Sequence, residues 1–400
     1  MANDWPGFRG PTGQGTSASK GLPAKWSGTE NIAWKTELPG PGTSSPVVFG
    51  KKVFITCYSG FNVPGEEGRM EDLMLHLVCL DRTTGRKVWT TDAKPKLPEL
   101  EQFRRDQHGY ASGTPAVDDG QVYVFWGKTG AMAFDHGGKK IWERDLGERI
   151  HEWGTCGSPV LHQNLVIINA SVESDSLVAL DKQTGKEVWR VGDLKESWNT
   201  PILVNVGNKT ELVVAEMGRI LGYDPASGDE LWTCDTDIPW YMVPSLVADK
   251  GIVYCVGGRS PGGSLAVKAG GRGDVTSTHR LWTSNKGSNV TSPVYHDGHL
   301  YWMHESQEIA FCLKADTGKV VYEERVSRRD QMYPSPVLAD GKIYYVNRTG
   351  TTFIVPAKPE FKVLATNILG ERGNFMSSPA VSGKNLLIRS NSHLFCIGEE

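Results

Sequence analysis

The stretch SPVLADGKIYYV, Ser335 to Val346, is the repeat that decides the fold. Ser-Pro-Val opens a short strand, Ala-Asp-Gly-Lys forms a turn, and the β-branched and aromatic run Ile-Tyr-Tyr-Val suits a second strand. Copies of it recur along the chain at intervals of about 43 residues, a period that fits one four-stranded propeller blade. The eight copies start at Ser45, Thr114, Ser158, Thr200, Pro244, Ser292, Ser335 and Ser378.

The second half of each repeat is another pair of strands around a tight turn. In LDKQTGKEVW, Asp181 can accept hydrogen bonds from turn amides and Gly185 can adopt a positive φ. The tryptophan that ends this half, Trp189, is a large apolar side chain suited to packing between neighbouring blades. Equivalent tryptophans stand at Trp89, Trp142 and Trp232, whereas the later copies degenerate.

The last copy stops after its third strand, HLFCIGEE, and the missing fourth strand is found near the other end of the chain. NIAWKTEL carries Trp34 where the other blades have their tryptophan, and a ring closed by both termini protects its sheet edges. We therefore expect an all-β protein, a single eight-bladed β-propeller of four-stranded blades over residues 31–400. Residues 1–30 are expected to form an extended arm over the surface.

Composition limits the partners. The chain has 43 Lys and Arg against 46 Asp and Glu, a net charge of -3, so a nucleic-acid partner is not expected. Its apolar runs are shorter than the roughly 20 residues of a membrane span, so no transmembrane segment is expected.

The half-repeat ALDKQTGKEVW, Ala179 to Trp189, resembles the tryptophan-docking repeat of the pyrroloquinoline-quinone (PQQ) propeller superfamily. The N-terminal DWPGFRGPTGQGTS is similar to the mature start of exported members. The superfamily includes quinoprotein dehydrogenases and the lipoprotein scaffold of outer-membrane assembly. The resemblance therefore implies a periplasmic or secreted protein of the cell envelope, whose signal peptide is not part of this sequence.

The resemblance also bears on cofactors. PQQ dehydrogenases of the superfamily carry a disulfide between adjacent cysteines beside the quinone, and a Ca²⁺ ion held by acidic and amide side chains. The seven cysteines here include no adjacent pair, and the histidines do not follow a metal-binding spacing. We therefore expect no metal site and leave PQQ with Ca²⁺ as a doubtful cofactor.

Irregular loops place the function at one end of the ring. The first repeat is longer than the others by roughly 25 residues, in the connections Ser59 to Met74 and Ala93 to Ser112. In a four-stranded blade with strands A to D, both belong to the end that carries the D–A and B–C connections. Loop variation on a rigid scaffold is where function usually lies.

The segments before the A strands carry recurrent aromatic residues, and the B–C connections add arginines and histidines. Such side chains at one mouth form a plausible pocket for a polar, flat or ringed ligand. The ligand-binding candidates are Tyr110, Trp153, Trp198, Trp240, Tyr241, Arg259, Tyr333, Arg348 and Arg389. The catalytic candidates, which could move protons, are His108, His151, Glu152 and His304.

Two functions remain open. The first is a scaffold that binds a protein partner, a small polar molecule or a carbohydrate through the D–A/B–C face. The alternative is an enzyme, either a quinoprotein-like oxidoreductase or a carbohydrate-active enzyme, with a polar active site at the funnel mouth. Convergence of an acid–base pair in one deep pocket would favour the enzyme.

Overall fold

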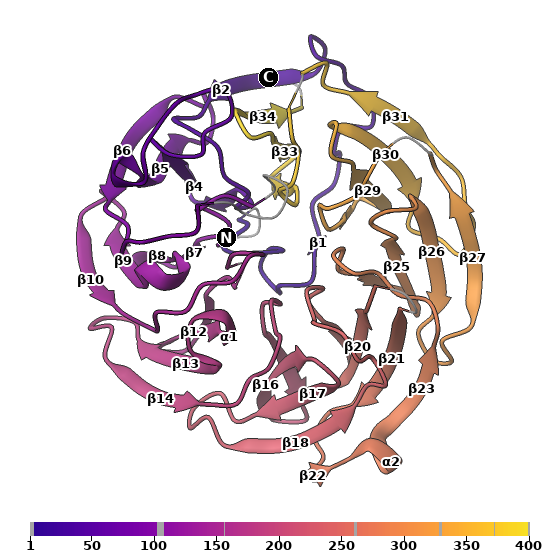
Figure 1. Ribbon diagram of the computed structural model, residues 1–400. Helices are drawn as coiled ribbons and strands as arrows, with labels where there is room; N and C mark the ends of the chain where they lie inside the picture. The colour runs from indigo at the N-terminus through magenta and orange to yellow at the C-terminus, as the bar shows by residue number, and fades with distance from the viewer. Residues whose placement is uncertain are drawn as a thin grey trace.

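Eight four-stranded antiparallel sheets surround a central axis in the computed structural model, which describes residues 4–101, 108–155, 157–259, 262–327, 330–371 and 373–398 (Figure 1). The strands of each blade, A to D, follow one another from the axis to the rim. The predicted all-β, eight-bladed propeller is therefore confirmed.

Blades are numbered here from the first repeat, and each is given by its strands A to D. Blade 1 consists of β3 (Val47–Phe49), β4 (Lys52–Ser59), β5 (Met74–Asp81) and β6 (Lys87–Ala93), and blade 2 of β7 (Ala116–Val117), β8 (Gln121–Phe125), β9 (Ala131–Asp135) and β10 (Lys140–Arg144). Blade 3 consists of β11 (Val160–His162), β12 (Leu165–Ala170), β13 (Ser176–Asp181) and β14 (Glu187–Val191), and blade 4 of β15 (Ile202–Val206), β16 (Lys209–Glu216), β17 (Arg219–Tyr223) and β18 (Glu230–Asp235).

Blade 5 consists of β19 (Val247–Asp249), β20 (Ile252–Gly257), β21 (Gly263–Lys268) and β23 (Arg280–Ser284), and blade 6 of β24 (Val294–His296), β25 (His299–Met303), β26 (Ile309–Lys314) and β27 (Val320–Arg325). Blade 7 consists of β28 (Val337–Ala339), β29 (Lys342–Val346), β30 (Thr351–Pro356) and β31 (Ala365–Ile368), and blade 8 of β32 (Ala380–Ser382), β33 (Asn385–Arg389), β34 (His393–Ile397) and β2 (Ile32–Glu37). The described helices are single turns: η1 (Met70–Asp72), η3 (Gly127–Thr129), α1 (Ser171–Ser174) and α2 (Thr276–His279). None of them is long and apolar enough to cross a membrane.

The ring is closed as the sequence predicts. Strand β2 pairs antiparallel with β34, with Trp34 opposite Cys396, so the fourth strand of the last blade comes from the N-terminal part of the chain. The apolar core lies between adjacent blades, where the two faces of neighbouring sheets interdigitate.

Tryptophans of the D strands dock onto the C–D turn of the next blade. The indole N–H of Trp142 donates to Lys182 O at 2.8 Å, and its ring lies on Gly185, where a Cβ atom would come within 2.6 Å of the indole. Gly185 has φ 66°, so the turn needs glycine for its backbone conformation as well as for space. The same hydrogen bond joins Trp34 to Arg82 O, Trp89 to His136 O, Trp189 to Pro225 O and Trp282 to Ala315 O.

Blade 4 departs from this pattern because blade 5 lacks the regular C–D turn. The indole N–H of Trp232 donates instead to Glu211 Oε2 within its own blade, at 2.7 Å. The connection that replaces the turn contains α2 and a short strand, β22 (Gly273–Asp274), which pairs parallel with β18. The degenerate sequence before Trp282 thus marks a local change in how two blades are joined.

The N-terminal arm, expected over residues 1–30, packs onto the ring through a few buried residues and is otherwise half-buried or exposed where the structure describes it. Trp5 is 1% exposed and exchanges two backbone hydrogen bonds with Val48 at the inner edge of blade 1. Gln14 then accepts a hydrogen bond from Ala248 N in blade 5, opposite blade 1, and strand β1 (Thr16–Ser17) pairs parallel with β28 of blade 7 (Figure 1). The arm thus crosses the axis at the end that carries the A–B and C–D turns, which we call the closed end.

Candidate functional site

A ring of hydroxyl groups surrounds the axis. The Ser or Thr that precedes each A strand lines one central cavity, and the ring consists of Ser45, Thr114, Ser158, Thr200, Ser245, Ser292, Ser335 and Ser378. At seven successive junctions the backbone N–H of one member donates to the hydroxyl oxygen of the next, at 2.9–3.3 Å. The fifth member is Ser245 and not Pro244, because blade 5 has Pro-Ser where most repeats have Ser-Pro.

The cavity, of about 160 Å³, opens toward the D–A and B–C connections, which form the open end. We call it the funnel. Besides hydroxyl groups, its wall carries five aromatic rings from the segments before the A strands, and Phe8 of the arm also lines it. Five of the predicted residues line it: His108, Trp153, Trp198, Tyr241 and Tyr333.

Four of these rings contact one another along blades 2 to 5. Trp153 meets His108 edge-on at 6.2 Å between ring centroids and lies 6.3 Å from Tyr241. Trp198 meets Tyr241 edge-on at 5.5 Å, and its indole N–H donates to Gly154 O at 2.9 Å. Such edge-to-face contacts hold aromatic walls in fixed orientations. The ring of Tyr333 lies under the guanidinium of Arg348, with 5.5 Å between the guanidinium carbon and the ring centroid.

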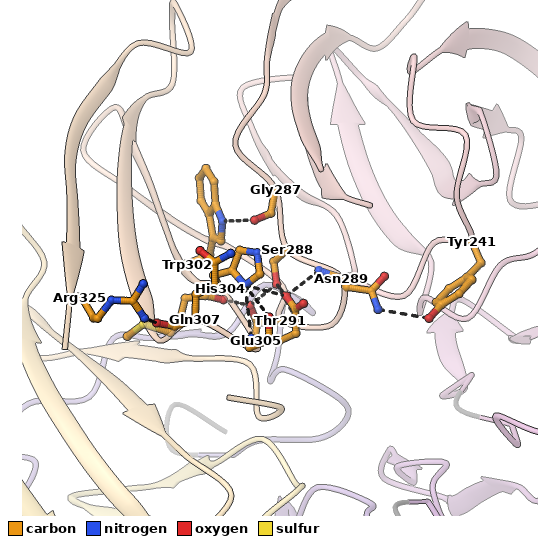
Figure 2. A network of polar contacts seen from close by, with 12 residues as sticks. Tyr241, Gly287, Ser288, Asn289, Thr291, Trp302, His304, Glu305, Gln307 and Arg325 are labelled. Atoms are coloured by element: carbon orange, nitrogen blue, oxygen red, sulfur yellow. Dashed lines mark hydrogen bonds and ion pairs between the residues drawn. The ribbon is translucent and has the colours of Figure 1, made fainter. Parts of the chain in front are cut away.

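Asn289 is the amide of the funnel, and the sequence analysis missed it. Figure 2 shows it between Tyr241 and a buried acidic group: its Nδ2 donates to Tyr241 Oη at 3.2 Å, and its backbone N–H donates to Glu305 Oε2 at 2.9 Å. Glu305 also accepts a hydrogen bond from Ser288 at 3.1 Å. Within the described chain, the buried Asn289 Oδ1 has no hydrogen-bond partner. It is therefore a buried acceptor beside the funnel whose hydrogen-bonding capacity the described residues leave unused.

His108 is the histidine of the described funnel lining. Burial, and then the positive charge of Arg348, lower the pKa of His108 to about 4. The imidazole is thus neutral at physiological pH and contributes a ring face and one N–H to the funnel.

The other predicted histidines lie outside the funnel. His151 packs edge-on against Trp198 at 5.0 Å, and its Nδ1 accepts a hydrogen bond from Trp153 N at 3.2 Å. His304 lies beside Glu305, with 3.5 Å between Nδ1 and Oε2 (Figure 2). Glu152 is exposed. The structure therefore does not bring the predicted acid–base candidates together in one pocket among the residues that it describes.

Four ligand-binding candidates also lie elsewhere. Tyr110 is buried and accepts a hydrogen bond from Asn62 Nδ2 at 2.9 Å, so it joins the two long connections of blade 1, of which residues 102–107 lie outside the described residues. Trp240 is 38% exposed beside the funnel, and Arg259 is exposed. Arg389 is buried and donates to the backbone and hydroxyl oxygens of Ser44 at 2.9 and 2.8 Å, which joins blade 8 to blade 1.

A second group of polar side chains lies between blades 2 and 3. Glu99 and Glu173 line a small cleft there with Lys128 and Arg149. Burial raises the pKa of Glu99 to about 7 and that of Glu173 to about 8. Thr155 Oγ1 donates to Glu173 Oε1. The structure thus holds carboxyl groups that bind protons near neutral pH, although their sequence context reads as ordinary loop residues.

The funnel does not fit PQQ held by Ca²⁺. Calcium takes six to eight oxygen ligands, usually with carboxylates among them, whereas the described lining has hydroxyls, aromatic rings and one amide. Within the described residues, no group of three or more His, Cys, Asp or Glu could hold a metal ion. The six described cysteines are buried free thiols.

Comparison with known proteins gives matches of two kinds. The chain is 31% identical over 153 residues to the quinoprotein alcohol dehydrogenase PedH of Pseudomonas putida, covering 35% of this chain and 24% of that protein. It is 22% identical over 261 residues to the outer membrane protein assembly factor BamB of Nitrosomonas eutropha, covering 53% of this chain and 57% of that protein. The matches thus span about a quarter and just over half of these relatives.

Solved structures share the fold at 12% identity. The quinohemoprotein alcohol dehydrogenase from Comamonas testosteroni superposes with a TM-score of 0.71, covering 100% of this chain and 81% of that chain. BamB from Moraxella catarrhalis superposes with a TM-score of 0.65, covering 92% and 97%.

The family model that matches the sequence covers most of the ring. It is described as outer membrane protein assembly factor BamB and matches residues 74–324 and 173–400. With the docked tryptophans and the eight blades, this match shows that the chain belongs to the PQQ-type repeat propeller family represented by BamB.

Proposed function

We propose that this chain is a binding scaffold of the cell envelope that holds a segment of a protein partner at its open end. Similarity to BamB, an outer membrane protein assembly factor, supports a protein partner, and the similarity to both relatives supports an exported location. The observation that carries the proposal is the composition of the funnel, which combines fixed aromatic walls with one free acceptor.

The size of the funnel favours an inserted side chain. Its volume of about 160 Å³ is below the roughly 300–1,000 Å³ typical of small-molecule pockets. Aromatic anchors that fill such desolvated pockets dominate protein–protein binding energies. Asn289 Oδ1 favours an anchor that also carries a donor, such as the N–H of tryptophan or the O–H of tyrosine.

Peptide selection on the immobilised protein tests this function. We expect selected 12-residue peptides to share a Trp or Tyr anchor, and Tyr241→Ala to weaken their binding at least tenfold. Trp240→Ala is the matched control, because Trp240 is adjacent in sequence but does not line the funnel. Its affinity should stay within about twofold of that of the unchanged protein. Equal losses in both variants, at unchanged melting temperature, would contradict the proposal.

A substitution of Asn289 tests whether the bound anchor carries a hydrogen-bond donor. Asn289→Leu keeps the approximate volume but removes the acceptor Oδ1 and the hydrogen bond to Tyr241. We expect this variant to bind Trp- or Tyr-containing peptides more weakly, while their Phe versions bind both proteins alike. Isothermal titration calorimetry with the paired peptides measures the difference.

A further inference from the structure

A serine, a histidine and an aspartate form one hydrogen-bonded chain in blade 1. Asp92 Oδ1 lies 2.7 Å from His76 Nδ1, and His76 Nε2 lies 2.8 Å from Ser59 Oγ. Because a carboxylate only accepts, Nδ1 carries the proton in the neutral imidazole, and Nε2 accepts from the hydroxyl of Ser59. A base held by a carboxylate in this order of contacts is the arrangement that activates a serine nucleophile.

The sheet of blade 1 holds the three side chains in place. They come from three adjacent strands, the end of β4, the start of β5 and the end of β6, and His76 is opposite Asp92 in the ladder. Ser59 and His76 lie two residues from Cys57 and Val78, on the face that packs against blade 8, since side chains alternate along a strand. His76 is 8% exposed and Ser59 is half-buried, so the base is shielded while the serine is partly open to solvent.

The residues that follow Ser59 supply hydrogen-bond donors beside its hydroxyl. Among the described residues, no acceptor is bonded to the backbone N–H of Gly60 or of Phe61. Gly60 has φ 85°, and a Cβ atom there would collide with Asp72 O, so this sharp turn needs glycine. Backbone N–H groups next to a nucleophile can stabilise the oxyanion that forms when a carbonyl is attacked.

The connection that begins at Ser59 and runs to Met74 is negatively charged, which limits the substrate. It contains four acidic residues and one basic residue: Glu66, Glu67, Glu71, Asp72 and Arg69. The guanidinium of Arg69 is already paired with Asp72 at 3.3 Å. A negative potential at the serine repels anionic substrates and favours neutral or positively charged ones.

We propose that Ser59 is the nucleophile of an acyl-transfer site that cleaves neutral or cationic carboxylic esters. Ser59 Oγ bonds to the acyl carbon while its proton passes to His76 Nε2, and this proton then goes to the leaving alcohol as the ester C–O bond breaks. Water next adds to the acyl carbon with His76 Nε2 taking its proton, and that proton returns to Ser59 Oγ as the acid leaves. His76 is the catalytic base and Asp92 positions it. The activity is separate from partner binding in the funnel, so either can fail alone.

A biotinylated fluorophosphonate, which reacts covalently with activated serines, is the first probe. We expect it to label the unchanged protein at Ser59, as mass spectrometry of tryptic peptides would show, and Ser59→Ala to lose this label. Hydrolysis of 4-nitrophenyl acetate should fall roughly 100-fold in the same variant. Absence of the label from Ser59 in the unchanged protein would overturn the proposal, whether or not any variant folds.

Two variants separate activation of the serine from its mere exposure. His76→Gln should slow the labelling of Ser59 roughly 100-fold, because the base is lost. Asp92→Asn should slow it roughly tenfold at unchanged melting temperature, since the side chain of Asp92 is 61% exposed, and Asp92→Glu should recover part of the rate. Equal labelling rates in the unchanged protein, His76→Gln and Asp92→Asn would overturn the proposal.

Ser306→Ala is the matched control. Ser306 Oγ also contacts a histidine, at 3.4 Å from His304 Nδ1, but Glu305 lies against the same ring nitrogen, 3.5 Å away. No carboxylate therefore orients that imidazole through its other nitrogen in the part of the chain that the structure describes. Ser306→Ala should keep both the label and the ester hydrolysis, and a loss of either in this variant would show that the reactive serine is not Ser59.

Discussion

The two ends of the propeller axis both carry aromatic residues, yet they use them differently. At the closed end, Trp5 is 1% exposed, and its backbone pairs with Val48 in the first blade. At the open end, Trp153 and Tyr241 line a cavity, and Trp240 beside them is 38% exposed. The closed end therefore uses Trp5 as core, whereas the open end presents the rings of Trp153 and Tyr241 at a cavity wall.

The backbone shows the same difference. Along the closed end, the arm accepts hydrogen bonds from backbone N–H groups at the inner edges of the blades. Val117 N donates to Pro6 O, and Leu338 N donates to Gly15 O, both at 2.8 Å. Ala248 N donates to the side chain of Gln14 at 2.7 Å. Protected edges stabilise a sheet and prevent pairing with other chains. A partner is therefore to be sought at the open end, where side chains and not strand edges are presented.

The largest expected effect comes from Trp5→Ala, which removes a buried side chain from the closed end. We expect a loss of about 4 kcal/mol in the free energy of unfolding, since large-to-small changes in a core leave a cavity. Trp240→Ala at the open end should cost less, about 1 kcal/mol, because Trp240 is 38% exposed and its ring, among the described ring contacts, packs only on the neighbouring Tyr241. Denaturant titration of both variants measures the contrast, and similar losses would show that the two ends do not differ in this way.

The blades were predictable from sequence and the arm was not, for a physical reason. A blade is a local unit, so its period, its turn glycines and its docked tryptophans such as Trp189 all appear within about 43 residues. The arm bonds through its backbone to Val48 and Leu338 and through the Gln14 side chain to Ala248, all of which lie far away in the sequence. Backbone pairing of this kind leaves no residue pattern in the arm itself.

The funnel was predictable in part. Aromatic residues before the A strands identified part of its wall, although Tyr110 and Trp240 follow the same pattern and do not line it. Asn289 and the hydroxyl ring were missed, since Asn, Ser and Thr before a strand read as ordinary loop residues. Arg389 was misassigned because its sequence does not show that Ser44, 345 positions away, is its partner.

The next largest effect is the pH dependence of stability that the buried carboxyl of Glu173, at the open end, should cause. The pKa of Glu173 is raised to about 8, so the folded protein binds more protons than the unfolded chain between about pH 4.5 and 8. Below pH 4.5 the Glu173 carboxyl is protonated in both states and does not oppose folding. As the pH rises from 4.5 to 8, the unfolded chain releases this proton first, so the free energy of unfolding falls. Glu173→Gln should therefore be more stable than the unchanged protein at pH 9 by about 2 kcal/mol, and similar to it at pH 5.

Glu216→Gln provides the contrast in the neighbouring blade. Glu216 is also buried, but its Oε1 accepts a hydrogen bond from Arg219 Nε at 2.8 Å. Removing this charge leaves an arginine without its partner, so the variant should be less stable at both pH values. If Glu173→Gln is destabilised in the same way, Glu173 is ionised in the folded protein and the assignment is wrong.

The smallest expected effect is the pH dependence of stability that comes from His108 in the funnel wall. Burial and Arg348 hold the pKa of His108 at about 4, below the ordinary value of 6.5, so the unfolded chain binds more protons between these two values. The unchanged protein should lose stability as the pH falls from 6.5 to 4, and His108→Gln should lose less, by about 1 kcal/mol at pH 4. Chemical denaturation across this range measures the slope. Arg348→Gln should reduce the slope of stability against pH only slightly, because burial is the larger cause of the lowered pKa. Equal slopes in His108→Gln and the unchanged protein would show instead that His108 is in contact with water and that the funnel is not desolvated around it.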